Sequence, residues 1–129
     1  MHLIVDGMNV IGSRPDGWWR DRAGARRLLV RKLGILAGDG AVGDVTVVFD
    51  GQPVSGEVDE AAAAGVSAVF APGGPDAADH AIVHLVEDLV RWPGAEVRVV
   101  TSDAVLAHRV RSLSAGVERA GAFRGRFES

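Results

Sequence analysis

Four aspartates stand at points where the chain changes from a strand-like run to a turn or a helix. Asp6 and Asp50 each close an apolar run, Asp103 follows a third run after two hydroxyl residues, and Asp79 lies in the first turn of a predicted helix. Carboxylates that are held together repel one another, and a divalent cation relieves that repulsion. Oxygen ligands in a chain without cysteine favour Mg²⁺ or Mn²⁺ over zinc. Such ions activate water for attack on phosphate esters.

Each of these positions also has an ordinary structural explanation. Aspartate commonly forms turns after strands. Asp76 is expected to cap the helix that carries Asp79, since the spacing of three resembles a capping box. Thr101 and Ser102 could cap the following helix, or could donate hydrogen bonds to a metal-bound aspartate. The metal hypothesis therefore requires the four aspartates to meet at one edge of the fold.

Asn9 follows Asp6 by three residues in the run V-D-G-M-N. Gly7 would permit a sharp turn and a close approach of the backbone to a ligand. The Asn9 amide could then bind a phosphate or steady a carboxylate, and a helix cap or an Asx turn is the alternative.

Hydrophobic periodicity predicts the elements that carry these residues. Buried strands are predicted at 2–5, 45–49, 66–70 and 96–100, with a short fifth strand at 117–119. Helices are predicted at 22–37 with Asp21 as N-cap, between the breaks at 72–75 and 93–94, and at 103–113. Leu28 and Val105 are among the side chains expected to face inward. The segments 12–21 and 51–65 are predicted loops, the second with a helical turn at 58–64, and the tail 120–129 has no clear period.

Strands that alternate with helices predict an α/β fold with a mainly parallel sheet and helices on both faces. The 129 residues, of which 47% are hydrophobic, suit one domain over the whole chain. Ligands bind beyond the carboxyl ends of parallel strands, which is where the aspartates are predicted to lie.

Charge is unevenly distributed along the chain, although the net charge is only −3. Residues 33–90 contain ten acidic residues and no Lys or Arg, whereas 14–32 hold seven of the fourteen basic residues. This pattern suits a metal site beside a phosphate-binding surface, and the alternative is a helix with a solvated arginine face.

The absence of cysteine excludes disulfides, thiolate zinc sites and cysteine nucleophiles. The apolar run at the amino terminus is too short for a signal peptide, and no run is long enough for a membrane helix. We therefore expect a soluble, cytoplasmic protein with no membrane partner.

Trp18 and Trp19 lie in the predicted loop 12–21, close to arginines. Exposed aromatic rings beside arginine suit stacking on the bases of single-stranded RNA. The alternative is a hydrophobic clasp over the sheet or a dimer contact.

Four motifs together resemble a known family. They are I-V-D-G-M-N-V-I at 4–11, V-V-F-D-G at 47–51, A-A-D-H-A-I at 77–82 and V-V-T-S-D at 99–103. In this order they are similar to the YacP-like branch of the NYN domains, within the PIN-like nuclease superfamily. The resemblance runs from Met1 to about Phe123, and V-F-D-G also resembles the second-strand motif of flap endonucleases.

The resemblance implies a PIN-like three-layer α/β/α sandwich with four or five strands, a divalent metal and endoribonuclease activity. Carried over by position, Asp6, Asp79 and Asp103 match the metal-binding acids of the family. Asn9 matches the Asn of the first motif, and Asp50 matches the acid that closes the second strand. The family often places a further acid four residues after the position of Asp79, where this chain has Val83. Asp76 could replace that acid, or the site could hold one metal weakly.

The resulting hypothesis is hydrolysis of single-stranded RNA by water, assisted by Mg²⁺ or Mn²⁺. The predicted catalytic residues are Asp6, Asn9, Asp79 and Asp103, and the predicted metal ligands are Asp6, Asp50, Asp79 and Asp103. Supporting contacts are predicted for Asp76, Thr101 and Ser102, and RNA contacts for Arg14, Trp18, Arg20, Arg22 and Arg26. The candidate RNAs are mRNA on the ribosome, tRNA and rRNA, and a homodimer is left open. The alternative function is a PIN-like module that binds RNA or a ribosome without cutting, which the departure at Val83 favours.

Overall fold

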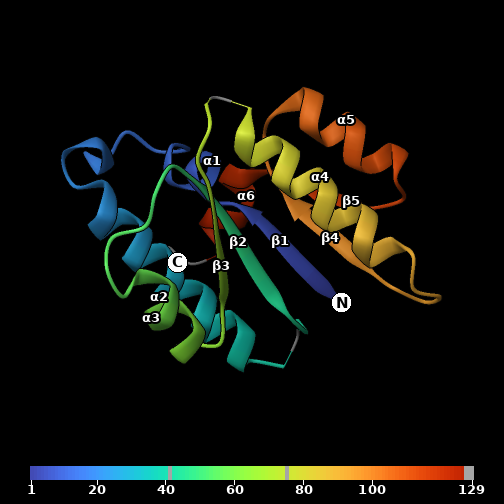
Figure 1. Ribbon diagram of the computed structural model, residues 1–129, viewed down its shortest axis with the longest axis horizontal. Coiled ribbons are helices and arrows are strands. Elements are labelled where there is room, and N and C mark those ends of the chain that lie inside the picture. The colour runs from blue at the N-terminus through green and yellow to red at the C-terminus, as the bar shows by residue number, and fades with distance from the viewer. Residues whose placement is uncertain (41, 75, 127–129) are drawn as a thin grey trace.

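Five parallel strands form the centre of the molecule (Figure 1). The computed structural model describes residues 1–40, 42–74 and 76–126. The strands are β1 (His2–Asp6), β2 (Val45–Asp50), β3 (Ser67–Ala71), β4 (Val97–Val100) and β5 (Gly116–Glu118). They lie in the order β3-β2-β1-β4-β5, so β1 is central. Because every neighbouring pair is parallel, the carboxyl ends of all five strands meet at one edge, as the sequence predicted.

Helices cover both faces of this sheet, which gives the three-layer α/β/α sandwich (Figure 1). The helices are α1 (Gly7–Ile11), the 3-10 helix η1 (Trp18–Arg20), α2 (Arg22–Gly38), α3 (Glu57–Ala63), α4 (Ala77–Val90), α5 (Ala104–Ser112) and α6 (Ala120–Gly125). α4 and α5 pack on one face, and α1, α2, α3 and α6 pack on the other. No helix in the described part of the chain is long and apolar enough to cross a membrane.

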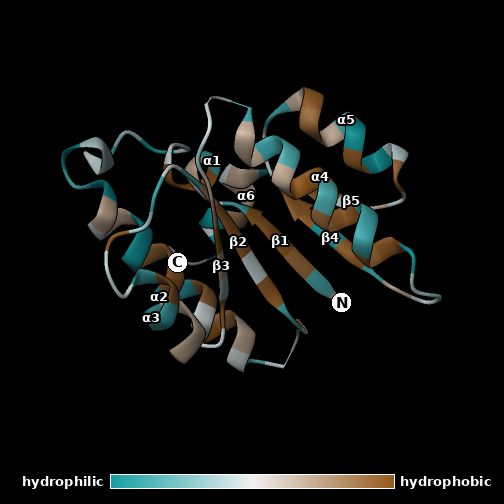
Figure 2. Cartoon of the chain, in the orientation of Figure 1, coloured by the Kyte–Doolittle hydropathy of each residue, from teal (hydrophilic) through white to brown (hydrophobic). Residues whose placement is uncertain are grey.

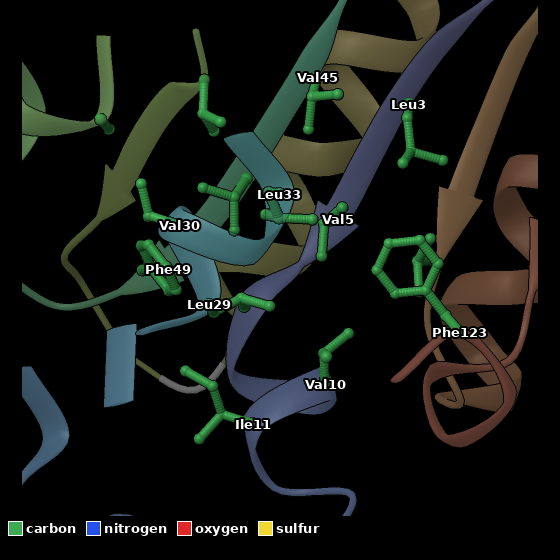
Figure 3. Close-up of a cluster of buried hydrophobic side chains, with 14 of the residues drawn as sticks. Leu3, Val5, Val10, Ile11, Leu29, Val30, Leu33, Val45, Phe49 and Phe123 are labelled. Carbon is green, nitrogen blue, oxygen red and sulfur yellow. The ribbon is translucent and has the colours of Figure 1, made fainter. Parts of the chain in front are cut away.

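One apolar core lies on each side of the sheet, because successive strand residues point to opposite faces. Leu3 and Val5 of β1 belong to the core beneath α1, α2 and α6, whereas Ile4 belongs to the core beneath α4 and α5. Figure 3 shows the first core, where the ring of Phe123 from α6 points toward Val5 and Val10. The strands are correspondingly hydrophobic, while the segment 12–21 is largely hydrophilic (Figure 2).

Two side chains expected to face inward are exposed. Leu28 of α2 is 45% exposed because the buried face of this helix is formed by Arg26, Leu29, Val30 and Leu33. Val105 of α5 is 71% exposed, since Leu106, Ala107 and Val110 are the residues that pack on the sheet. Both helices are therefore rotated relative to the predicted faces.

Both predicted N-cap positions are confirmed, but only one of the two side chains makes a capping hydrogen bond. Asp21 caps α2 and accepts a hydrogen bond from the backbone N–H of Gly24 at 2.9 Å. Asp76 occupies the N-cap position of α4 but makes no capping hydrogen bond. Its φ of −99° and ψ of 2° depart from the extended backbone that N-cap residues usually adopt. Of the predicted break 72–75 and the tail 120–129, residues 75 and 127–129 lie outside the described residues.

Candidate active site

Asp6 lies at the carboxyl end of the central strand and is only 7% exposed. The register pairs Val5 with Val100, so the end of β1 lies beside the residues that follow β4. Thr101 is one of these, and its hydroxyl donates a hydrogen bond to Oδ2 of Asp6 at 2.9 Å. A buried carboxylate at the centre of the edge is thus held in one orientation by a buried threonine.

The loop after β4 is fixed to α1 and α6 by hydrogen bonds around Thr101 and Ser102. The backbone N–H of Ser102 donates to Oδ1 of Asn9 at 2.8 Å, and the backbone N–H of Ala120 donates to Oγ of Ser102 at 2.9 Å. The backbone N–H of Asp103 donates to Oγ1 of Thr101 at 3.1 Å. Asn9 and Ser102 therefore hold the edge together, and no described residue accepts a hydrogen bond from Nδ2 of Asn9.

The electrostatics of Asp6 show that the four aspartates share one environment. Burial raises the pKa of the Asp6 carboxyl to about 6, and the charges of Asp79, Asp50 and Asp103 act in the same direction. The hydrogen bond from Thr101 acts in the opposite direction and lowers the pKa. The aspartates that the sequence placed after three strands and in the first turn of a helix thus lie near enough for their charges to act on Asp6.

The pKa values of Asp79 and Asp50 are raised as well. Burial raises the pKa of Asp79, helped by the charges of Asp103, Asp76 and Asp50 and opposed by His80. Burial also raises the pKa of Asp50, and the nearby charge of Arg22 acts against that rise. Negative charge at this edge is thus only partly balanced by the protein's own cations.

Asp103 has a structural contact in addition to its place at the edge. Its Oδ1 accepts hydrogen bonds from the backbone N–H groups of Val105 at 2.9 Å and Leu106 at 3.1 Å, which caps α5. Its backbone is extended, in contrast to that of Asp76. Asp76 lacks a capping bond but lies near enough to raise the pKa of Asp79.

The chemistry of these donors fits a hard divalent cation. Hard cations take oxygen ligands, and a cation would relieve the repulsion that adds to burial in raising the pKa of Asp6 and Asp79. Among the described residues, no three His, Asp or Glu side chains converge into a ready-made ligand cage. The carboxylates would have to be drawn closer together when an ion binds.

Gly7 is required by packing inside the protein. A Cβ at this position would lie 2.4 Å from the ring of Phe49, which is far too close. The sequence did not indicate this packing reason for Gly7: the glycine lets α1 start directly after Asp6, against the buried Phe49.

Val83 is 7% exposed and belongs to the core beneath α4 and α5. The position where the family often has an acid is thus occupied here by an apolar side chain packed in the protein interior. The acidic neighbours of Asp79 in this chain are instead Asp103, Asp76 and Asp50.

Arg22 links the predicted RNA-binding segment to the aspartates. Its guanidinium lies 5.2 Å from the centre of the Trp18 ring. Its charge acts against the burial that raises the pKa of Asp50. Trp18 is half-buried against the first core, as the clasp alternative expected, whereas Trp19 is 48% exposed. Arg14 and Arg20 are exposed in the same segment.

Arg26 does not belong to this surface. It is 8% exposed, and its guanidinium makes two hydrogen bonds to Glu57, at 2.6 and 3.0 Å. A buried bidentate ion pair of this kind joins α2 to α3. We therefore remove Arg26 from the predicted RNA contacts.

Arg124 is a residue of this region that the sequence did not indicate. Its guanidinium donates to the carbonyl oxygens of Val10 and Ile11 and pairs with Asp16. These contacts fasten α6 and the segment 12–21 to the carboxyl end of α1. The short helix α6 has no period from which the position of Arg124 could have been inferred.

Comparison with known proteins gives a family match and a fold match. A model of the YacP-like NYN domain matches residues 3–128. Two crystal structures of Rae1 (YacP) from Bacillus subtilis, one of them of a point mutant, align with 99% of this chain and 74% of that chain at 24% identity. Their TM-scores are 0.78 for the mutant and 0.75 for the other, which establishes the PIN-like fold. No curated protein matches the sequence.

Proposed function

The chain belongs to the YacP-like NYN domain family, which is of nuclease type, and on this premise we propose that it is a divalent-metal-dependent endoribonuclease. The proposed reaction is hydrolysis of phosphodiester bonds in single-stranded RNA at the edge formed by Asp6 and its neighbours. The observation that supports it most is that four aspartates, from β1, β2, α4 and the start of α5, lie near one another. The charges of the other three act to raise the pKa of Asp6.

In this proposal the aspartates hold the cation and the hydroxyl and amide groups position them. The ligands are Asp6, Asp50, Asp79 and Asp103, with Mg²⁺ or Mn²⁺ as the ion. When bound, the ion neutralises charge on the phosphate and lowers the pKa of an attacking water. Thr101 orients Asp6 through its hydrogen bond, and Asp76 adds negative charge beside Asp79.

Asn9 and Ser102 have a positioning role in the same site. Their mutual hydrogen bond fixes α1 to the loop that carries Thr101 and Asp103. Nδ2 of Asn9 is then the group that can donate to a phosphate oxygen.

RNA contacts are proposed for the segment next to Asp50. Arg14, Arg20 and Arg22 attract the phosphate backbone, and Trp18 and Trp19 offer aromatic surface to unpaired bases. The RNA classes that we propose are mRNA on the ribosome, tRNA and rRNA; they rest on the family resemblance alone. We also propose that the protein acts in the cytoplasm.

One rival function has a specific observation in its favour. The packing of Val83 in the core removes an acid that the family often has, and the aspartates do not form a ready-made cage. Both features would suit a module that binds RNA or a ribosome without cutting it.

Cleavage of end-labelled single-stranded RNA separates the two functions. We expect products with Mn²⁺ or Mg²⁺ and none with EDTA. Asp79→Asn should slow cleavage by at least about a hundredfold, because losing a group that merely supports a metal ligand already costs 10–100-fold. Asp88→Asn is the matched control, since Asp88 lies exposed on the same helix and its ion pair within the described part of the chain is with Arg91. RNA binding without metal-dependent products would establish the rival.

A further inference from the structure

A pocket of about 240 Å³ lies between the segment 12–21, α2 and α6. Its wall toward the core is formed by Val10 and Ile11 of α1, and its other walls include Trp18 and Leu28. Its volume is below the roughly 300–1,000 Å³ of sites for drug-sized ligands, so it suits one flat ring system.

Leu28 is an apolar side chain whose position the packing of α2 does not explain. It is 45% exposed although it lies on a helix with a well-filled buried face, and it lines this pocket. An aromatic ring between Trp18 and Leu28 would cover apolar surface on both sides.

Lys32 supplies a positive charge at the pocket. It is the only lysine of the chain, is half-buried, and makes no ion pair with any described residue. The pocket has two acidic lining residues: Asp16 is paired with Arg124, and Asp21 accepts the capping hydrogen bond from the backbone N–H of Gly24. Of the two lining cations, Arg124 is engaged with Asp16, so Lys32 is the one positioned to meet a negatively charged group on a ligand.

The pocket lies one short helix away from the edge that carries the aspartates. Ile11 follows Asp6 by five residues in one short helix, which corresponds to about 8 Å along its axis. Trp18 lines the pocket and also lies against Arg22, whose charge acts on Asp50. A strand of RNA at the aspartates would thus have a neighbouring base within reach of the pocket.

From these observations we propose that the pocket binds one base of the single-stranded RNA, with Lys32 beside the phosphate attached to it. The proposal rests on the proposed function for the kind of ligand, and it adds a base-binding subsite made by Trp18, Leu28 and Lys32. The subsite would set the position of the strand relative to Asp6.

Binding without metal tests this proposal independently of cleavage. In EDTA, the dissociation constants of a short single-stranded RNA and of an abasic oligonucleotide of equal length and charge are compared by fluorescence anisotropy. We expect the abasic strand to bind at least about fivefold more weakly, because stacking of one base is worth about 1–3 kcal/mol.

Leu28→Glu should reduce this ratio toward one, because it places a charge in the pocket. Val58→Glu is the matched control, since Val58 is 43% exposed, close to the 45% of Leu28, but lies on α3. It should keep the wild-type ratio. Taking the ratio of the two strands cancels the general repulsion of RNA by an added acid.

Lys32 gives a second measurement, because acylation of the only lysine can be followed by mass spectrometry. Saturating RNA should slow acylation of Lys32 more than the abasic strand does. An unchanged ratio in Leu28→Glu, equal acylation with both strands, or no RNA binding would each overturn the proposal. If the pocket behaves as expected but Mn²⁺ produces no cleavage, the proposed function fails and the base-binding subsite remains.

Discussion

At the scale of single residues, Asp6 is an acid that the folded protein keeps partly protonated. Its pKa of about 6 exceeds the ordinary value of 3.8, because the carboxyl is buried among other acids. The folded state therefore holds the proton more tightly than the unfolded state. It follows that the contribution of Asp6 to stability is lost as the pH rises from about 4 through 6.

This loss can be measured by urea unfolding in EDTA between pH 4 and pH 7.5. We expect the contribution of Asp6 to be at most about 3 kcal/mol, at 1.36 kcal/mol for each unit of pKa. Asp6→Asn, whose amide oxygen can still accept from Thr101, should unfold at a higher urea concentration than wild type at pH 7. Identical pH dependence in the two proteins would show that the charge of Asp6 is not destabilising.

Thr101 is the residue whose effect on Asp6 is most direct. Thr101→Val removes the hydroxyl that lowers the pKa of Asp6, so cleavage should reach its half-maximal rate at a higher pH. Thr101→Ser keeps the hydroxyl and should restore the wild-type pH profile.

Thr46→Val is the matched control for loss of a buried threonine hydroxyl. Oγ1 of Thr46 is hydrogen-bonded to Nε2 of His2 at 2.9 Å, far along the strands from the aspartates. Both valine variants should lose about 1–3 kcal/mol of stability. If Thr46→Val also shifts the pH profile of cleavage, the shift comes from loss of a buried threonine hydroxyl in general and not from the hydrogen bond between Thr101 and Asp6.

At the scale of elements, the ion pair between Arg26 and Glu57 joins two helices. Burial acts to raise the pKa of Glu57, but the hydrogen bond and charge of Arg26, the N–H of Val54 and the charge of Arg27 outweigh it, and the pKa is lowered. Removing one partner of a buried pair leaves the other charge without compensation.

Glu57→Gln should therefore lower the free energy of unfolding by about 3–5 kcal/mol. Glu60→Gln should change it by at most about 1 kcal/mol, because the pair of Glu60 with Arg27 is exposed. RNA affinity of the folded protein, measured well below the unfolding temperature, should be the same in both variants. A specific loss of RNA affinity in Glu57→Gln would return Arg26 to the RNA-binding set.

The longer elements could be predicted from the sequence because their hydrophobic pattern repeats over several turns or fills a buried strand. The strands and α4 were found close to their predicted bounds. α1 and α6 were missed because five and six residues are too few to show a helical period. The faces of α2 and α5 were predicted in part, since a buried arginine and an exposed valine contradict the simple rule that apolar residues face inward.

The positions of the aspartates followed from strand order, whereas their hydrogen bonds did not. A parallel sheet brings the ends of β1, β2 and β4 to one edge, whatever the details of packing. The bond between Asn9 and Ser102 joins residues that are 93 positions apart, and the contacts of Arg124 depend on a helix that the sequence did not indicate. Such contacts are set by the tertiary fold and have no local pattern.

At the scale of the whole molecule, the uneven charge distribution has more than one cause. Part of the basic segment lies beside the aspartates, where Arg22 acts on Asp50. Another arginine of that segment, Arg26, is buried and forms an ion pair with Glu57. Farther along the chain, Arg98 and Arg126 form ion pairs with Glu118. Counting charges along the sequence therefore predicted a basic flank but could not tell structural arginines from those available to RNA.

The central claim is that the edge around Asp6 cuts RNA with a divalent cation. Its most direct test is the single-turnover rate of RNA cleavage in Mn²⁺, with enzyme in excess, for wild type and Asp6→Asn. We expect Asp6→Asn to be at least about a hundredfold slower while remaining folded and able to bind the RNA. Equal rates for the two proteins would contradict the claim.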